Sequence, residues 1–266
     1  MFKSIDSKEY YESIYRKYNK VAYIKTDPIE LVYNLDGHRE FISFVSSIFS
    51  YGKVKSIKKF LVEFFTYYGK DPFNINSYAS NCNLYYRFQK NEDIKIFVEF
   101  VTYIYKNYGS IEKLFLSFSS VLEEAFIKFC KFAREFGNQE GAHRGYFNLF
   151  PSGEGLYSKR LNMFLRWMIR SDNIDFGLWT MYKPSELKYP MDTHITKFAI
   201  ANNLINSKQN NIKNVNRITE YFRKYSYNDP VKYDFALTRQ ALLIGCTFKK
   251  SHICNNCLDN NMCLFC

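Results

Sequence analysis

The chain has 266 residues, enough for one large domain or two small ones with a buried core. Lysine and arginine number 37 against 26 acidic residues, and the net charge of +11 favours a polyanionic partner such as nucleic acid, although the composition bias of an AT-rich genome gives a similar excess. The start of the chain lacks a secretory signal pattern and no apolar stretch is long enough to span a bilayer, so we expect a cytoplasmic protein with no membrane partner.

Apolar residues recur at three and four positions along most of the chain, and two-residue alternation is scarce. This period predicts an all-α fold. A glycine-rich stretch over 137–155 is the one long irregular segment that we expect in the middle of the chain. The predicted helices cover 29–33, 39–50, 54–68, 93–108, 111–136, 159–170, 194–201, 214–225 and 233–244.

Charged residues mark the starts of two predicted helices in the second half. One helix begins with Lys159 and Arg160 and carries Arg166 and Arg170 four residues apart on one face, where they either contact a phosphate or a base or face solvent. Asp192 precedes the next helix. An aspartate there accepts backbone N–H bonds, which fix its orientation and keep it ionised. Taken alone, this is the pattern of a helix N-cap.

Five of the seven cysteines lie in the last 21 residues, directly after a predicted apolar helix. Without an export signal, clustered thiols are more often metal ligands than disulfides. Four of them, separated by seven, two and five residues, suit a [4Fe–4S] cluster, in which each iron takes one thiolate. Cys266 adds a second Cys-x-x-Cys pair, so a four-thiolate zinc site is the alternative. The predicted cluster ligands are Cys246, Cys254, Cys257 and Cys263.

The cysteine spacing, together with the segment from Pro190 to Ile195, resembles the endonuclease III-like branch of the helix-hairpin-helix DNA glycosylases. The first cysteine gap is one residue longer than is usual there. The resemblance implies a two-lobed helical body over residues 1–245 with a cleft, followed by a metal-binding loop over 246–266. It further implies a DNA repair glycosylase that excises a damaged base from duplex DNA, with or without lyase activity.

Specific residues match the motifs of that superfamily. Asp192 corresponds to the carboxylate that stabilises positive charge on the sugar, and Lys159 to the amine that attacks the sugar carbon. Gly153 and Gly155 correspond to the hairpin glycines that approach a DNA phosphate, but Glu154 and two extra residues before Lys159 depart from the pattern. As plain alternatives, Asp192 is only a cap and Lys159 only an exposed lysine.

The break between the second and third predicted helices is where superfamily members insert a wedge into the duplex. Tyr51 is the candidate wedge, and Lys53 a candidate backbone contact; a core tyrosine and a solvated lysine are the alternatives. Together with the hairpin glycines, the predicted DNA-binding residues are Tyr51, Lys53, Arg160, Arg166 and Arg170.

From about Asp27 onward the chain also resembles an uncharacterised bacterial family, a domain of unknown function. We therefore predict a monomeric DNA glycosylase, with DNA as its partner. The first alternative is a noncatalytic nucleic-acid-binding protein with a structural metal site. A second is a regulator whose cluster senses oxidants.

Overall fold

The computed structural model describes residues 7–75, 83–152, 157–209, 211–251 and 254. Over these residues the chain is helical, with two isolated bridges and no β-strand, which confirms the predicted all-α class. No helix in these ranges is long and apolar enough to cross a membrane. The elements are α1 (Ser7–Tyr18), η1 (Val21–Thr26), α2 (Ile29–Asn34), α3 (Arg39–Ile48), α4 (Val54–Tyr68), α5 (Asn91–Tyr108), α6 (Ile111–Phe118), α7 (Leu122–Gln139), α8 (Arg144–Phe147), α9 (Lys159–Ile169), η2 (Pro184–Glu186), α10 (Thr193–Ala201), α11 (Ile212–Arg223) and α12 (Asp234–Ile244).

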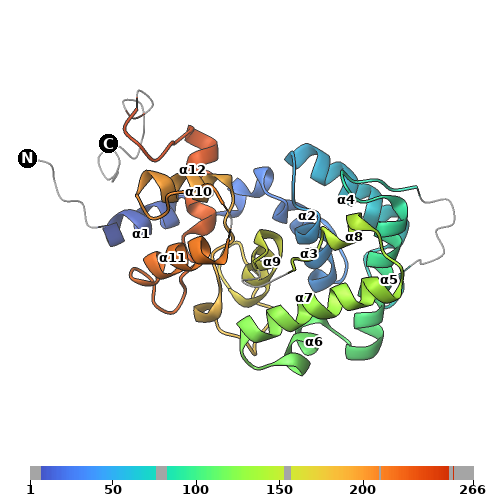
Figure 1. The fold of residues 1–266 in the computed structure, drawn as a ribbon. Coiled ribbons are helices and arrows are strands. Elements are labelled where there is room, and N and C mark those ends of the chain that lie inside the picture. Colours follow the sequence, from blue (N-terminus) through green and yellow to red (C-terminus); the bar gives the residue numbers. More distant parts are fainter. Residues whose placement is uncertain (1–6, 76–82, 153–156, 210, 252–253, 255–266) are drawn as a thin grey trace, which may run out of the picture.

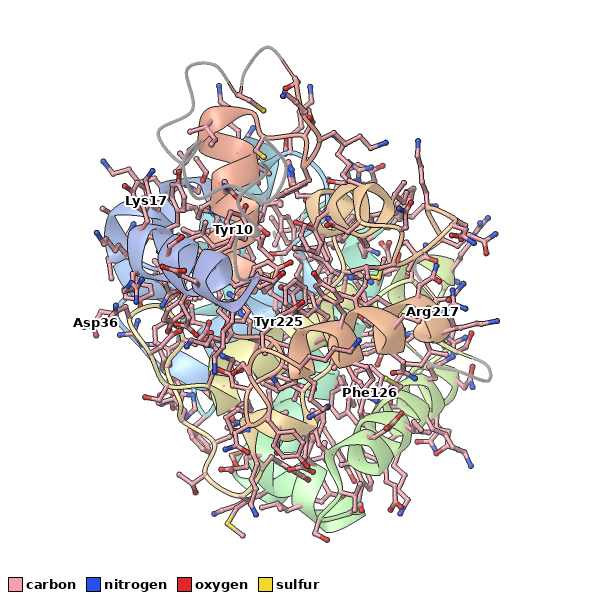
Figure 2. All side chains as sticks on the ribbon, turned by 90° about the vertical axis from the view of Figure 1, so that its left-hand side faces the viewer. Tyr10, Lys17, Asp36, Phe126, Arg217 and Tyr225 are labelled. Carbon is pink, nitrogen blue, oxygen red and sulfur yellow. The ribbon has the colours of Figure 1, made fainter. Side chains whose placement is uncertain are left out.

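Helices from opposite ends of the described chain lie together. α1 packs on α12, and α10 and α11 lie on the same side of the molecule, while α4 to α8 form the other side (Figure 1). Tyr11 of α1 holds these elements together, because its ring contacts Phe222 at 5.2 Å and Tyr225 at 5.0 Å between centroids. In Figure 2, Tyr10 of the same helix and Tyr225 are seen on the same face.

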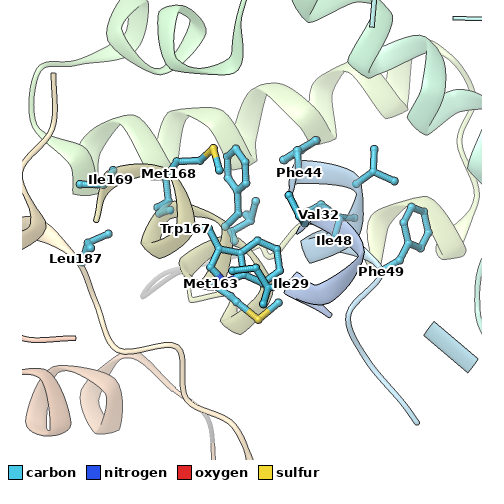
Figure 3. Close-up of a cluster of buried hydrophobic side chains, with 14 of the residues drawn as sticks. Ile29, Val32, Phe44, Ile48, Phe49, Met163, Trp167, Met168, Ile169 and Leu187 are labelled. Atoms are coloured by element: carbon cyan, nitrogen blue, oxygen red, sulfur yellow. The ribbon is translucent and has the colours of Figure 1, made fainter. Parts of the chain in front are cut away.

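α9 lies between the two groups of helices and packs on α3 (Figure 1). Every residue from Leu161 to Ile169 is buried, as expected for a helix enclosed on all sides. Phe164 of α9 meets Phe44 of α3 at 5.2 Å and Trp179 at 5.4 Å, both edge to face. Figure 3 shows the core around Trp167, with Ile29, Val32 and Ile48 nearby. This core fixes the start of α9 relative to the end of α3.

Several elements differ from the prediction. The expected helix over 111–136 is two helices, because the Ser119 hydroxyl accepts a bond from the Val121 N–H (3.0 Å) and ends α6. α1 was not predicted, since its buried face consists mainly of tyrosines, which obscure an apolar period. The four-residue α8 was also missed inside the segment expected to be irregular.

Candidate functional site

Tyr51 lies in the short connection between α3 and α4. Its ring is half-buried, and its hydroxyl donates to the Gln89 side-chain oxygen, while its carbonyl accepts from the Tyr86 hydroxyl. Burial raises the pKa of the Tyr51 phenol, with Arg160 opposing the shift, so the hydroxyl stays protonated. The break between the helices therefore holds the aromatic ring in one orientation at the edge of the core.

Arg160, the second residue of α9, stacks on this ring with its guanidinium carbon 4.9 Å from the ring centroid. The guanidinium donates to the carbonyls of Ile48 (2.7 Å), Asn148 (2.6 Å) and Leu149 (3.2 Å). These carbonyls lie at the ends of α3 and α8, where backbone oxygens lack helical partners. Burial lowers the pKa of Arg160. Its hydrogen-bond partners among the described residues are backbone carbonyls, which are neutral and do not cancel its positive charge.

Two cavities share Tyr51, Asn148 and Arg160 as part of their walls. Their volumes are about 610 Å³ and about 340 Å³. Among the described residues that line them there is no carboxylate, while Arg160 lines both, Arg144 the larger and Lys159 the smaller, so these residues give each cavity a positive lining. The larger cavity is completed by Phe88, Arg144 and Gly145, and the smaller by Ser50, Pro151, Tyr157, Ser158 and Lys159.

Lys159 is the first residue of α9, and the Ser158 hydroxyl caps this helix by accepting from the Leu161 N–H (3.3 Å). Just before it, the Tyr157 hydroxyl donates to the carbonyl of Tyr189 (3.1 Å) and accepts from the backbone N–H of Met191. The start of α9 is thereby tied to the segment that leads into α10. Lys159 lines the smaller cavity beside this connection.

Asp192 is the N-cap of α10. One carboxylate oxygen accepts the backbone N–H groups of His194 and Ile195, each at 2.8 Å. Burial lowers the pKa of His194; the charge of Asp192 opposes this shift, and Lys159 contributes to it. The same two residues also act on buried Asp234, whose pKa is raised to about 7 by burial and by Asp192, against Arg166 and Lys159. Asp192 and Lys159 thus share one electrostatic neighbourhood, although Asp192 lines neither cavity.

Arg166 and Arg170 require a correction, because both interpretations of the sequence placed them at the surface. Each side chain is only 4% exposed. Arg166 pairs with Asp175 and Asp234, and Arg170 pairs with Asp175, with Asp172 (3.0 Å) and with Asp229 (2.9 Å). Buried charges persist only when paired, and these pairs join α9 to α12 and to the loops after α9 and α11. The two arginines therefore do not present a surface for DNA.

The remaining predicted DNA contacts lie apart from this cluster or outside the described residues. Lys53 is exposed before α4 and lines neither cavity. Gly153 and Gly155 fall between α8 and α9 but outside the described residues. Phe88 and Arg144, which line the larger cavity, were not predicted from the sequence. A signal for the first was present in the run Tyr85-Tyr86-Arg87-Phe88, where aromatic and basic residues adjoin.

Two of the four predicted metal ligands, Cys257 and Cys263, also fall outside the described residues. The sulfur of Cys246 accepts from the Phe248 N–H and that of Cys254 from the Ser251 N–H, both at 3.4 Å. Within the described ranges, no group of three or more metal-ligating side chains is assembled. Phe248 is buried and meets Phe198 of α10 at 5.3 Å, which attaches the start of the cysteine segment to the helix that Asp192 caps.

No curated protein and no solved structure matched the chain. Residues 27–242, most of the sequence and nearly all of the described helices, match DUF2400, a family described as "Protein of unknown function". The match begins at the residue where the resemblance to an uncharacterised family was expected to begin and includes Tyr51, Lys159, Arg160 and Asp192. The chain belongs to the DUF2400 family.

Proposed function

We propose that this protein is a DNA repair glycosylase that removes a damaged base from duplex DNA and acts as a monomer. One observation carries the proposal: Lys159 and Arg160 line one cavity together with Tyr51, which lies more than 100 residues before them in sequence. None of the described residues that line this cavity is a carboxylate. A phosphate backbone is attracted to such a lining, while an amine beside it reaches a sugar.

In the proposed reaction the Lys159 amine attacks C1′ of the damaged nucleotide. The glycosidic C–N bond breaks, and its electron pair leaves with the base, which takes up a proton. The C1′–O4′ bond then breaks to leave a Schiff base, and of the two protons that the amine loses one goes to the ring oxygen and one to the departing base. Water hydrolyses the Schiff base, or loss of a C2′ proton expels the 3′ phosphate and cleaves the strand. Asp192, held by two backbone N–H groups, stabilises the positive charge that develops on the sugar.

We also propose that the fold contains a helix-hairpin-helix unit. A helix-hairpin-helix unit would consist of α8, the connection over 148–158 and α9, which places the Gly153 and Gly155 pair between two helices. Arg160 already bonds the end of α8 to the start of α9 and so closes this connection. In this proposal the helical body covers residues 1–245 and the metal-binding loop covers 246–266; α12, the last helix before that boundary, ends at Ile244.

For the C-terminal segment we propose a [4Fe–4S] cluster held by Cys246, Cys254, Cys257 and Cys263, with zinc as the alternative. The N–H donors beside the first two sulfurs fit thiolate ligands, which accept such bonds. A metal here would fasten the segment that Phe248 anchors to α10. Purification without oxygen, followed by metal analysis, tests this: a band near about 400 nm with about four irons per chain supports the cluster, whereas stoichiometric zinc without iron excludes it.

A second function is favoured by the position of Asp192, whose bonded oxygen is fully used in capping α10 and which lines neither cavity. On this alternative the protein binds nucleic acid without cutting it. The two functions differ in whether any base is released by a protein that binds DNA.

The decisive experiment is borohydride trapping on duplexes that each carry one damaged base. The wild-type protein should release a base and form a covalent adduct, and Lys159→Ala should abolish the adduct. Lys53→Ala is the matched control, because this exposed lysine lines neither cavity. Binding to every duplex with no base release from any of them would reject the glycosylase and favour the noncatalytic alternative.

A further inference from the structure

The larger cavity, which we call the Phe88 cavity, has features that the proposed reaction does not use. The Phe88 and Tyr51 rings lie parallel, with 3° between their planes and 6.2 Å between their centroids. Phe88 is 59% exposed, so its ring is accessible from solvent. Flat aromatic surfaces at the mouth of a cavity are suited to stacking on a planar ligand.

Arginines surround these rings. The guanidinium carbon of Arg87 lies 5.6 Å from the centroids of both Tyr51 and Phe88, and that of Arg160 lies 4.9 Å from Tyr51. Arg144 lines the same cavity and is exposed. Among the described residues none of the three forms a salt bridge with a carboxylate. The cavity therefore combines aromatic stacking surfaces with positive charge that carboxylates leave uncompensated.

The positions of these groups are built into the local structure. Gly52 has φ +105° and lies so close to Arg87 that an added Cβ would be 2.7 Å from its terminal nitrogen. Buried Gln89 accepts from the Tyr51 hydroxyl and donates to the Gly145 carbonyl (2.8 Å). One side chain thus links the aromatic wall of the cavity to the helix that bears Arg144, and the wall is preorganised rather than a chance grouping of surface residues.

We propose that the Phe88 cavity binds one unpaired nucleotide, with its base against Phe88 and Tyr51 and its phosphate between Arg144 and Arg160. A volume of about 610 Å³ is within the range of small-ligand sites. An acidic peptide would satisfy the arginines but would leave the exposed part of the Phe88 ring uncovered. The cavity shares Tyr51, Asn148 and Arg160 with the one that Lys159 lines, so the bound nucleotide lies beside the one that Lys159 attacks. This inference rests on the proposed function for the identity of the polymer.

The test measures the affinity of full-length protein for a short single-stranded DNA by fluorescence anisotropy. Phe88→Ala should weaken binding about tenfold, the value expected for one lost base stack, while Phe88→Tyr should retain it. Arg144→Ala should weaken binding and reduce the slope of log affinity against log salt by about 0.7. The matched controls are Tyr227→Ala, which removes an exposed tyrosine, and Arg217→Ala, which removes an exposed arginine of α11 that projects from the molecule in Figure 2. Each should change affinity by less than about twofold.

A competition experiment with a free nucleotide shows whether the ligand of the cavity is a free nucleotide or a nucleotide within a polymer. Competition by millimolar deoxyadenosine monophosphate that is lost in Phe88→Ala supports the cavity and identifies a free nucleotide as its ligand. No competition, with Phe88-dependent binding of the strand, supports a nucleotide within a polymer. Equal affinities for Phe88→Ala and Tyr227→Ala in both arms would overturn the proposal.

Failure of this proposal and failure of the proposed function give different results. If Phe88→Ala binds normally while wild-type adducts still form and depend on Lys159, only the cavity assignment is wrong. If binding depends on Phe88 but no base is released from any duplex, only the glycosylase assignment is wrong.

Discussion

At the residue scale, Asp192 combines two roles that substitution can separate. Its carboxylate caps α10 through the His194 and Ile195 N–H groups, and in the proposed reaction it also stabilises charge on the sugar. An asparagine oxygen caps a helix nearly as well as an aspartate oxygen but carries no charge. The capping role therefore tolerates Asp192→Asn, whereas the catalytic role does not.

We expect Asp192→Ala to lower the free energy of unfolding by about 1 kcal/mol and Asp192→Asn to lower it by less than about 0.5 kcal/mol. Base release should fall by at least about 100-fold in both variants. Urea titration and excision kinetics check these values. If Asp192→Asn retained full excision, the carboxylate would be a cap alone.

The pKa of His194 reports on both proposed catalytic residues. It is lowered by burial and by nearby cations including Lys159, and Asp192 opposes the shift. Lys159→Met should therefore raise the pKa of His194, and Asp192→Asn should lower it further. With four histidines in the chain, the imidazole signals can be followed by NMR titration. If the pKa of His194 changed in the opposite direction in either variant, the charges of Lys159 and Asp192 would not act on His194 as described.

The same shift makes stability depend on pH in a defined direction. The unfolded chain takes up a proton at the ordinary histidine pKa of 6.5, whereas folded His194 binds it only at lower pH. The contribution is fully present above pH 6.5 and is lost as the pH falls from there through the folded pKa. His194→Gln should remove this part of the decline, as measured by urea midpoints across that pH range. Parallel pH profiles of the two proteins would contradict the assignment.

At the element scale, sequence periodicity identified helices with aliphatic and phenylalanine faces and failed where local chemistry decides. α3 and α9 were found because their apolar residues recur regularly. α1 was missed because Tyr10, Tyr11 and Tyr18 form much of its buried face. The end of α6 was missed because it depends on a serine hydroxyl rather than on glycine or proline.

The candidate site was less accessible to sequence reasoning. The resemblance selected Tyr51, Lys159 and Arg160, which the fold brings to the same cavity walls. The burial of Arg166, by contrast, could not be predicted from the sequence of its own helix, because one of its partners, Asp234, lies 68 residues away. Burial of a charge depends on partners that only the tertiary fold supplies.

Gly145 shows how a short helix is held in place. A Cβ at this position would lie 2.2 Å from an Asp93 carboxylate oxygen and 2.4 Å from the Phe88 carbonyl. The other oxygen of Asp93 accepts the Tyr146 N–H at 2.9 Å, so α8 cannot retreat without losing that bond. The absence of a side chain thus sets the distance between the two walls of the Phe88 cavity.

Gly145→Ala should reduce the free energy of unfolding by about 2 kcal/mol, because backbone and a bonded carboxylate must move. We also expect it to weaken single-stranded DNA binding as much as Phe88→Ala does. Gly141→Asn is the control, since nothing lies within 4 Å of its Cβ position and asparagine tolerates its positive φ. Thermal unfolding and anisotropy measure both effects, and similar values for the two variants would contradict the close packing.

At the scale of the whole molecule, positive charge is divided between an interior set and a surface set. Arg166 and Arg170 are neutralised inside by aspartates and connect α9 with α12 and neighbouring loops. Arg87 and Arg144 stay at the surface beside the cavities. The total of 37 lysines and arginines therefore overstates how many are free for a polyanion, and the two sets should respond differently to substitution.

Arg166→Met is the sharpest test of this division. Removing the guanidinium leaves Asp175 and Asp234 buried without one of their partners, and breaking such a pair costs about 3–5 kcal/mol. Chemical unfolding should show this loss, whereas Arg217→Met on α11 should change stability by less than about 0.5 kcal/mol. At a temperature where Arg166→Met is still folded, its DNA affinity and salt dependence should equal those of the wild type, because the side chain is only 4% exposed. Arg144→Ala should behave in the opposite way, with unchanged stability and weaker binding. A folded, stable Arg166→Met protein with reduced DNA affinity would instead show that Arg166 belongs to the DNA-binding surface.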